Sequence, residues 1–452
     1  MTLKFTVSGL RGVWGKGLDL EIINDYLSSF IHYLKSKNDS SNTVVVARDT
    51  RKTSPLILDF VSSVLRSYGI RVINLGVLTT PLTLFAIRET KADGGVIITA
   101  SHNPPEWNAL KFVDRGGVFI SQDVVNIISS FEKPRVSEWD QVGEEEEVRP
   151  DNILRRFINE VEKVIDTELI KNKKFRVGFD PVNGAGSIVG REILEYLGCK
   201  VFSINDDISK FPQRGTEPTQ STLKDLSKTV VENGCDIGFA LDPDGDRLAV
   251  VSNDGEIPGE EFTLPISVFS ALKYVSIGSY SKKIVINLST SSLTEHIASK
   301  FGFEIIRSKV GEANVVSTLK EVNGFIGGEG NGGVIFPPIN PARDSLVGMI
   351  LILLLLAKEN VKVSEVVSKL PTLEMVKTKT NSVISKEMIK DILDKIQNNY
   401  KLVESTDIDG SWFRFDKGWL HIRPSNTEPI TRIIFEGDKE FVEYTKKVIE
   451  NL

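Results

Sequence analysis

Short apolar runs rich in β-branched residues alternate with helix-like stretches along most of the chain, and three of these runs open similar blocks. Each of the three leads into a polar loop, and strand and loop together occupy residues 43–51, 175–187 and 284–292. In each block a helix-like stretch, a second strand-like run and another helix-like stretch follow, before a third strand-like run. Strands that alternate with helices in this order predict βαβ units and mostly parallel sheets.

The third strand of each block ends in a loop of unusual composition. The three loops are TASHNP (residues 99–104), DPDGDR (residues 242–247) and GGEGNGG (residues 327–333). In open α/β sheets, ligands bind beyond the carboxyl ends of the strands. We therefore expect one central cleft, to which each of the three blocks contributes one loop.

Changes in composition along the chain divide it into domains. The acidic run GEEEEVRPD (Gly143–Asp151) is typical of a linker or an exposed loop. Two further boundaries fall near residues 253–259 and near Pro371, and the remainder mixes helices with strands around a polar loop, RPSNTEP (residues 423–429). The predicted fold class is α/β, with three similar α/β domains of mixed, mostly parallel sheets and a smaller C-terminal α+β domain. The predicted domains are residues 1–148, 149–252, 253–370 and 371–452.

Composition and charge narrow the class of protein. The 452 residues exceed what one hydrophobic core usually serves, and 40% of them are hydrophobic and 26% charged, as in globular proteins. The net charge is −6, and the chain has no block of Lys and Arg of the kind that neutralises nucleic-acid phosphates. The apolar run Leu346–Ala357 is too short to span a bilayer and predicts a buried helix.

The same observations give expectations for location and partners. The N-terminal segment lacks the apolar core of a signal peptide. We therefore expect a cytoplasmic protein that binds small molecules, with neither a nucleic acid nor a membrane as partner. The oligomeric state stays open, because no interface can be read from one sequence.

DPDGDR carries three carboxylates at alternate positions, directly after an apolar strand. Asp242, Asp244 and Asp246 would repel one another unless a cation neutralised them. Carboxylate oxygens suit Mg²⁺, and an EF-hand is excluded because Arg247 replaces the loop glycine and a strand precedes the motif. We predict one Mg²⁺ site here, with an exposed acidic turn as the alternative. Arg247 would be able to hold a phosphoryl group beside the metal.

Ser101 in TASHNP admits three interpretations. A serine hydrolase is disfavoured, because Ser101 lacks the G-x-S-x-G elbow and the adjacent side chain, His102, should point away from it. A turn formed by Asn103-Pro104-Pro105 is the second interpretation. The third is a serine that carries a phosphoryl group, whose charge of about −2 requires a nearby cation, and DPDGDR supplies a candidate site for one.

Two residues near Ser101 are candidates for charge balance or proton transfer. They are His102 and Lys111, the latter in the segment NALKF. For Lys111 the alternative is an ordinary surface lysine.

GGEGNGG formally contains the G-x-G-x-x-G of a dinucleotide site, but its context is wrong. Two prolines follow, where a helix would be needed to hold a pyrophosphate. Glycines would instead let Glu329 and Asn331 approach a ligand closely, and a carboxylate with an amide suits sugar hydroxyls. A plain glycine turn is the alternative.

RPSNTEP offers several hydrogen-bond donors in one loop, which predicts a phosphate site, with a structural loop as the alternative. The donors are Arg423, Ser425, Asn426 and Thr427, with Arg432 just beyond the loop. Taken together, the loops predict phosphoryl transfer on a sugar or polyol. Mutase, phosphatase and kinase remain open, although the lack of a P-loop and of kinase motifs disfavours an ATP-dependent kinase.

These motifs, in this order, resemble the α-D-phosphohexomutase family, which includes phosphoglucomutase, phosphomannomutase and phosphoglucosamine mutase. The resemblance spans the chain. It comprises SGLRG (residues 8–12), the four loops above, and the stretches DPVNGAG (residues 180–186), KFPQRGTEPT (residues 210–219) and KVGEANV (residues 309–315).

The resemblance implies four domains around one cleft and a role for each candidate residue. Ser101 would be phosphorylated and would bind Mg²⁺ together with the three aspartates, while Arg11, Arg247 and Lys111 would line the reaction centre. Glu329 and Asn331 would bind sugar hydroxyls. The non-reacting phosphate would be held by Arg423, Ser425, Asn426 and Thr427, and the wider substrate-binding set adds Lys309 and Arg432.

The implied reaction interconverts hexose 1-phosphate and hexose 6-phosphate, with hexose 1,6-bisphosphate as intermediate and activator. Gly333 stands where some relatives carry a histidine, and FTVSG (residues 5–9) replaces a common FGTSG. The form of the sugar loop is similar to that of archaeal relatives with broad activity, so we expect glucose and mannose phosphates as substrates. The alternatives are a phosphoglucosamine mutase, a Mg²⁺-dependent sugar phosphatase and a protein that binds sugar phosphates without turnover.

Overall fold

The structure is a computed structural model that describes residues 3–37, 42–210, 214–380, 384–424 and 430–450. The chain divides into two compact units. The first unit comprises Met1–Thr263 and Gly332–Ser364, and the second comprises Leu264–Asn331 and Glu365–Leu452.

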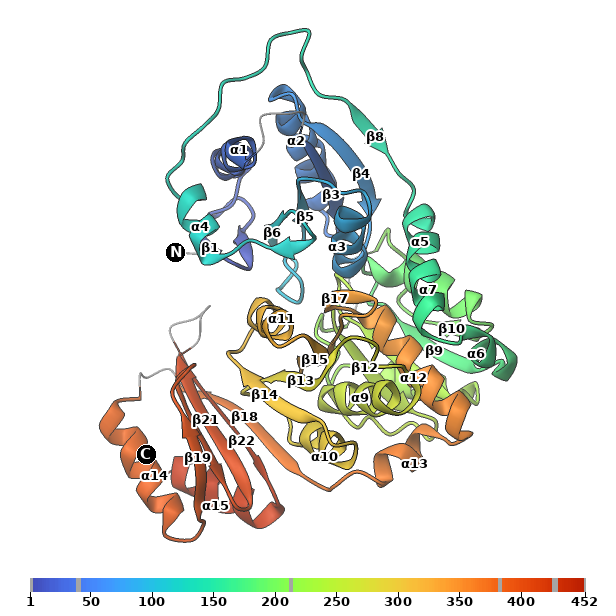
Figure 1. Cartoon of the computed structure of the whole chain (residues 1–452), viewed down its shortest axis with the longest axis vertical. Coiled ribbons are helices and arrows are strands. Elements are labelled where there is room, and N and C mark those ends of the chain that lie inside the picture. Colours follow the sequence, from blue (N-terminus) through green and yellow to red (C-terminus); the bar gives the residue numbers. More distant parts are fainter. Residues whose placement is uncertain (1–2, 38–41, 211–213, 381–383, 425–429, 451–452) are drawn as a thin grey trace. The chain divides into compact units, whose positions relative to one another are not determined.

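The first sheet of the first unit has parallel strands on one side and antiparallel strands on the other (Figure 1). Its strand order is β1 (Lys4–Thr6), β2 (Gly9–Val13), β6 (Trp107–Asp114), β5 (Gly94–Ile98), β3 (Thr43–Arg48), β4 (Arg71–Val77) and β8 (Glu145–Glu147), with β7 (Val118–Phe119) paired to β6.

Four helices pack against this first sheet. They are α1 (Leu20–Lys37), α2 (Ser54–Ser67), α3 (Thr80–Glu89) and α4 (Gln122–Ile128). One core joins α1, α2 and α4 to the sheet, and Phe30, Val46 and Phe112 are fully buried in it. Thr79 caps α3 by accepting a hydrogen bond from the backbone N–H of Leu82, which fixes where that helix begins.

The second sheet of the first unit carries the aspartate loop. Parallel strands β10 (Lys200–Ser203), β9 (Arg176–Asp180) and β11 (Ile237–Leu241) are followed by β12 (Leu248–Ser252), which is antiparallel to β11. The helices of this region are α5 (Pro150–Val164), α6 (Thr167–Lys173), α7 (Gly186–Tyr196) and α8 (Lys224–Glu232). DPDGDR is the turn between β11 and β12, so its carboxylates lie at the carboxyl end of a buried strand.

A segment distant in sequence completes the first unit. Strands β16 (Gly333–Phe336) and β17 (Asn340–Arg343) form an antiparallel pair that leads into α12 (Ser345–Glu359). Thirteen of the 15 residues of α12 are buried, which confirms the predicted buried helix. Its N-cap is Asp344, which accepts hydrogen bonds from the backbone N–H groups of Leu346 and Val347, and whose pKa is raised by burial to about 6.

The second unit contains a parallel three-stranded arrangement and an antiparallel sheet. Strands β14 (Glu304–Ser308), β13 (Ser281–Asn287) and β15 (Gly324–Glu329) pair in parallel, accompanied by α9 (Thr263–Tyr274), α10 (Leu293–Lys300) and α11 (Glu312–Glu321). Two short helices, η1 (Glu260–Phe262) and α13 (Val363–Ser368), lie at the points where the chain passes between the units.

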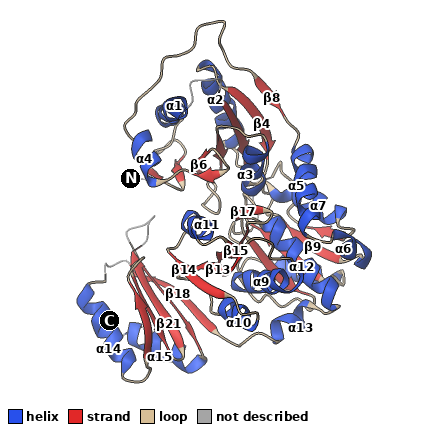
Figure 2. Cartoon of the chain, viewed as in Figure 1, coloured by secondary structure: helices blue, strands red, loops and turns tan. Residues whose placement is uncertain are grey.

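The C-terminal part of the second unit is the predicted α+β domain. Its antiparallel strand order is β18 (Glu374–Thr380), β22 (Thr431–Gly437), β21 (Gly418–Pro424), β20 (Ser411–Phe415) and β19 (Leu402–Thr406). Helices α14 (Lys386–Gln397) and α15 (Lys439–Glu450) pack against this sheet, with Ile392, Leu420 and Phe441 in the shared core (Figure 2). The predicted succession of α/β blocks before an α+β domain is therefore confirmed.

The prediction for the acidic run 143–151 is wrong in part. Residues Glu145–Glu147 form β8, which pairs in parallel with β4, and α5 begins at Pro150. Arg66 and Arg71 form ion pairs with Glu145 and Glu146. Because these arginines neutralise the glutamates, the acidic segment can occupy an edge of the sheet.

Among the described residues, no helix combines the length and the apolar character that a membrane crossing demands.

The burial of α12 predicts how two leucine-to-alanine substitutions differ. Leu353 in α12 is 0% exposed, whereas Leu56 in α2 is 50% exposed. Leu353→Ala should lower the free energy of unfolding by about 2–5 kcal/mol, because it removes buried apolar contacts and leaves a cavity. Leu56→Ala should change it by less than about 0.5 kcal/mol. Urea titration of both variants gives the comparison, and equal effects would contradict the assignment of α12 as core.

Candidate active site

The first unit brings together side chains from its two sheets. Ser101 follows β5, Lys111 lies on β6 and Arg11 lies on β2, in the first sheet. Asp242, Asp244, Asp246 and Arg247 lie in the turn between β11 and β12, in the second sheet. The predicted residues of TASHNP and DPDGDR meet in this unit, where Oγ of Ser101 contacts Asp242.

The three aspartates form a buried cluster suited to a cation. One carboxylate oxygen of each lies within 4.8 Å of the others, and Asp242, Asp244 and Asp246 are at most 1% exposed. Within the described part of the chain, Oδ1 of Asp244 and Oδ1 of Asp246 accept no hydrogen bond. Buried carboxylate oxygens rarely lack a partner, so this donor set fits a hard divalent cation.

Positive side chains from two other strands face the carboxylates. Nζ of Lys111 lies 2.7 Å from Oδ2 of Asp244, and Nη2 of Arg343 lies 2.6 Å from Oδ2 of Asp246. The hydroxyl of Thr80, the first residue of α3, also donates to Oδ2 of Asp244 at 2.7 Å. Lys111 is 5% exposed, so it is a residue of the site and not a surface lysine.

The pKa values of Asp242 and Asp244 are shifted in opposite directions, because their charges are balanced differently. Burial raises the pKa of Asp242 well above its usual range, and the neighbouring Asp246 and Asp244 add to this. Burial acts in the same direction on Asp244, but the charge and hydrogen bond of Lys111 outweigh it and lower the pKa of that carboxyl. Negative charge is therefore less compensated at Asp242, the aspartate that contacts Ser101, than at Asp244.

Ser101 lies in an unusual backbone conformation that directs its hydroxyl to the cluster. Its φ is +50°, in the left-handed region that non-glycine residues rarely adopt. Its backbone N–H donates to Oγ1 of Thr99 at 2.9 Å, and its Oγ donates to Oδ2 of Asp242 at 3.1 Å. A phosphoryl group on this oxygen would lie beside the carboxylates.

The expectation that the Ser101 and His102 side chains diverge is wrong. Oγ of Ser101 lies 3.4 Å from Nδ1 of His102. The left-handed backbone at Ser101 turns the two successive side chains toward each other. This proximity does not revive the hydrolase interpretation, because Nδ1 of His102 is already engaged by an arginine.

Arg247 holds His102 in its neutral form. Nη2 of Arg247 lies 3.0 Å from Nδ1 of His102, and a guanidinium can only donate, so Nδ1 is the acceptor. Burial, followed by the charges of Arg247 and Arg11, lowers the pKa of His102 to about 2. The imidazole therefore adds no positive charge to the site near neutral pH. Arg247 is held in turn by an ion pair with Glu217.

Arg11 approaches the same loop from β2. Its Nη1 donates to Oδ1 of Asn103 at 2.6 Å. Burial lowers the pKa of Arg11, and the nearby charges of Arg51 and Arg247 add to this. Several cations thus gather around Ser101, as a group that carries a phosphoryl would require.

The remaining predicted residues lie in the second unit. Glu329 ends β15, is buried, and accepts through Oε1 from Nδ2 of Asn287 at 2.7 Å and from the backbone N–H of Gly311 at 2.9 Å. Asn331 is half-buried, and Lys309 and Arg432 are exposed.

Arg423, at the end of β21, is a buried cation with unused donors. Burial lowers its pKa. Its Nε and Nη1 have no hydrogen-bond partner within the described ranges. A buried guanidinium with unused N–H groups suits an anion. Ser425, Asn426 and Thr427 lie outside the described residues.

Sequence reasoning missed two arginines of the first unit. Arg343 pairs with Asp246, and Arg51 donates to several carbonyls of the Ser101 loop. Arg51 belongs to the segment ARDTR at the end of β3, where an Asp-x-Arg pair was a usable signal. Arg343 gave no such signal, because its partner lies 97 residues away.

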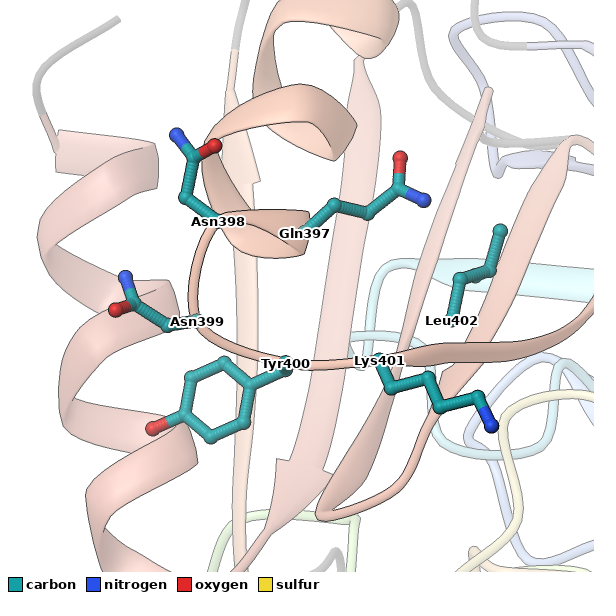
Figure 3. Close-up of a pocket in the computed structure, with 6 residues that line it drawn as sticks. All are labelled: Gln397, Asn398, Asn399, Tyr400, Lys401 and Leu402. Atoms are coloured by element: carbon teal, nitrogen blue, oxygen red, sulfur yellow. The ribbon is translucent and has the colours of Figure 1, made fainter.

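The hollow at the turn between α14 and β19 is a different feature (Figure 3). Its lining is Gln397, Asn398, Asn399, Tyr400, Lys401 and Leu402. These six consecutive residues include none of the predicted site residues, and their side chains point in different directions. The hollow is therefore not a candidate for the active site.

Four family models match successive parts of the chain. They describe the phosphoglucomutase/phosphomannomutase α/β/α domains I, II and III at residues 2–135, 155–255 and 268–373, and the C-terminal domain at residues 360–450. A phosphoglucomutase/phosphomannomutase of Thermococcus kodakarensis is 33% identical over 99% of this chain and 98% of its own. A phosphoglucosamine/phosphogalactosamine mutase of Sulfurisphaera tokodaii is 32% identical over 99% of each chain.

Solved structures have the same fold. A putative phosphomannomutase from Thermus thermophilus aligns with a TM-score of 0.80 and 22% identity, over 100% of this chain and 99% of its own. The N-acetylphosphoglucosamine mutase of Aspergillus fumigatus, crystallised with GlcNAc-6P and magnesium, aligns with a TM-score of 0.62 and 14% identity, over 99% and 95%.

The predicted family is therefore confirmed by domain models that together match nearly the whole chain and by full-length relatives more than 30% identical to it. The chain belongs to the phosphoglucomutase/phosphomannomutase family of α-D-phosphohexomutases, enzymes that transfer phosphate within sugar phosphates.

Proposed function

We propose that this enzyme interconverts the 1-phosphates and 6-phosphates of glucose, of mannose or of both sugars, through a phosphorylated Ser101 and a hexose 1,6-bisphosphate intermediate. The observation that carries the proposal is the contact between Oγ of Ser101 and Asp242, at 3.1 Å, inside a buried cluster of three aspartates. A serine hydroxyl that donates to a carboxylate in a cation-binding cluster is well situated to carry a phosphoryl group.

Mg²⁺ is the proposed metal, held by Asp242, Asp244, Asp246 and a phosphoserine oxygen. The buried Oδ1 atoms of Asp244 and Asp246, which accept no hydrogen bond from the described residues, support this assignment. When bound, the ion would neutralise charge that develops on the transferring phosphoryl group.

The protein's own cations have distinct proposed tasks around Ser101. Arg247 and Arg11 would bind oxygens of the phosphoryl group, because arginines recognise phosphates by paired hydrogen bonds. Their present partners, His102 for Arg247 and Asn103 for Arg11, hold them beside Ser101. Lys111 and His102 stay the candidates for the group that takes the proton of the sugar hydroxyl.

The second unit would supply the groups that bind the rest of the substrate. We propose that Glu329 and Asn331 bind sugar hydroxyls, since a fixed carboxylate and an amide can accept and donate to them. The unused donors of buried Arg423 support its assignment to the non-reacting phosphate. The proposed phosphate-binding set is Arg423, Ser425, Asn426 and Thr427, and the proposed substrate-binding set also includes Lys309 and Arg432.

A second candidate function is favoured by one of the relatives. The Sulfurisphaera tokodaii relative is named for hexosamine phosphates, at an identity almost equal to that of the Thermococcus kodakarensis relative. A phosphoglucosamine mutase would use the same centre around Ser101 and differ in the groups that bind the sugar. A sugar phosphatase is the remaining alternative.

Substitution of the proposed phosphoryl carrier tests the chemistry. Ser101→Ala, supplied with glucose 1,6-bisphosphate, should interconvert glucose 1- and 6-phosphates at least roughly a thousandfold more slowly than the wild type, because the oxygen that carries the group is gone. Intact-mass measurements should find a phosphorylated fraction in the wild type and none in the variant. The exposed Ser130→Ala is the matched control. Wild-type turnover by Ser101→Ala would refute the phosphoserine, and phosphate release that matches isomer formation would identify a phosphatase.

Substitution of one metal ligand tests the Mg²⁺ site. Asp244→Asn removes a negative ligand, so half-maximal activity should require at least about tenfold more Mg²⁺, while the Kd for the sugar phosphate changes by less than about threefold. Asp140→Asn, at an exposed position, should leave the Mg²⁺ requirement unchanged. Activity and calorimetric binding are measured across a Mg²⁺ titration. A variant with unaltered turnover at limiting Mg²⁺ would contradict the metal assignment.

Parallel assays settle the preferred sugar. We expect kcat/KM for glucose 1-phosphate and mannose 1-phosphate to lie within about tenfold of each other, and that for glucosamine 1-phosphate to be lower, since one pocket contact is worth about 1–3 kcal/mol. A higher kcat/KM for glucosamine 1-phosphate would favour the second candidate.

A further inference from the structure

Arg51 lies just after β3 and is buried, with 2% of its surface exposed. Its guanidinium donates mainly to main-chain carbonyls around Ser101. The bonds run from Nη2 to the carbonyls of Ser101 (2.6 Å) and Asn103 (2.7 Å), and from Nη1 to those of Pro104 (2.7 Å) and Trp107 (3.1 Å).

The fifth donor of Arg51 bonds to a fixed carboxylate. Nε donates to Oδ2 of Asp49 at 3.0 Å, so all five N–H groups of the guanidinium are used. Oδ1 of Asp49 accepts from the backbone N–H of Arg51 at 3.0 Å and from the hydroxyl of Ser54, in α2, at 2.7 Å. The guanidinium is thereby anchored to the end of β3 and to the start of α2.

The loop needs such an external donor because of its own sequence. Pro104 and Pro105 carry no N–H, so the loop has few donors with which to satisfy its carbonyls. Ser101 also has a φ of +50°, which is unfavourable for a residue with a side chain. Contacts outside the loop must therefore hold this conformation, and Arg51 supplies four of them.

In the second sheet, a similar arginine anchored to an aspartate lies beside the proposed metal ligands. Arg214 donates through Nε to Oδ2 of Asp180, at the end of β9, at 2.7 Å. Its Nη2 donates to the carbonyl of Leu241, the residue before Asp242, at 2.7 Å. The loop of Ser101 and the loop of Asp242 are thus each fixed by an arginine that is anchored to an aspartate at the end of a neighbouring parallel strand.

We propose that Arg51 is the positioning residue for the phosphoryl-carrying serine: its guanidinium fixes the main chain so that Oγ of Ser101 stays against Asp242. The inference rests on the proposed function. Its donors are all taken by the protein, so Arg51 has none left for a substrate, and its loss acts on the geometry of transfer. Misplacement of reacting groups by about 1 Å can slow a reaction on the order of a hundredfold.

The test compares two conservative substitutions. Lysine has three N–H donors and no planar fork, so Arg51→Lys can replace at most part of the set. We expect kcat to fall at least about tenfold while KM changes by less than about twofold. Arg176→Lys is the matched control, because Arg176 also donates to main-chain carbonyls, those of Asn233 and Gly234, but at the opposite end of its strand. This control should keep both kcat and KM.

A direct readout follows the phosphorylated enzyme. Protein that carries a ³²P-labelled phosphoserine is mixed with unlabelled glucose 6-phosphate in a single turnover, and transfer of the label from the protein to the sugar phosphate is followed. Transfer should be slowed in Arg51→Lys to the same degree as kcat, and the ³¹P resonance of its phosphoserine should broaden or shift. Arg176→Lys should match the wild type in both measurements.

The outcomes separate this inference from the proposed function. A wild type that does not interconvert the phosphates, or a fully active Ser101→Ala, rejects the proposed function and the positioning role with it. If Ser101→Ala is inactive while Arg51→Lys keeps the wild-type kcat, or raises KM alone, only the positioning role is rejected. Should Arg51→Lys fail to fold, Asp49→Asn replaces it, since that change loosens the anchor and leaves four bonds of Arg51; unchanged kcat there overturns the proposal.

Discussion

The burial of three like charges in one small volume is the constraint on which the first unit depends. Asp242, Asp244 and Asp246 are nearly inaccessible to solvent, and their carboxylates lie within 4.8 Å of one another. Such a group is stable only where cations approach it from several sides. Lys111 comes from β6 of the first sheet, and Arg343 from β17, far along the chain.

This constraint explains why residues 332–364 belong to the first unit. Arg343 contacts Asp246, and the hydroxyl of Ser345 donates to the carbonyl of Gly245 at 2.6 Å. Asn340 accepts from Arg88 of α3 at 2.5 Å. The segment that brings Arg343 to the aspartates is therefore held by the turn that carries these aspartates. Helix α12 follows this segment and packs into the core.

A second physical theme is the use of buried arginines to hold main-chain carbonyls at the ends of strands. Arg51 and Arg214 do so in the first unit, and Arg307 does so in the second, where it donates to the carbonyls of Asn287, Leu288 and Thr290. Loops at the carboxyl ends of buried strands contain carbonyls that neither a ladder nor water can satisfy. Arginine has five N–H donors, so one arginine side chain can donate hydrogen bonds to several of these carbonyls.

The sequence allowed the strands, the buried helix and the aspartate cluster to be predicted, because each has a local signal. Period and β-branching mark the strands, and carboxylates at alternate positions after an apolar run mark a cation site. The roles of Arg51 and Arg343 had to come from the structure, because the Asp-x-Arg pair of Arg51 does not tell which carbonyls it binds and the carboxylate that pairs with Arg343 lies 97 residues away. Strand β8 was hidden by its acidic composition, which is compensated by Arg66 and Arg71.

The two candidates for the proton acceptor, His102 and Lys111, differ in the contacts that they already make. His102 accepts from Arg247 through Nδ1, and a pKa near 2 makes its ring a very weak base while that bond stands. Lys111 is held by Asp244, a carboxylate that a metal would also engage. Its Nζ also lies 4.0 Å from Oδ2 of Asp246. The bond from Arg247 therefore weakens His102 as a candidate for the proton acceptor of the proposed reaction, as long as that bond stands.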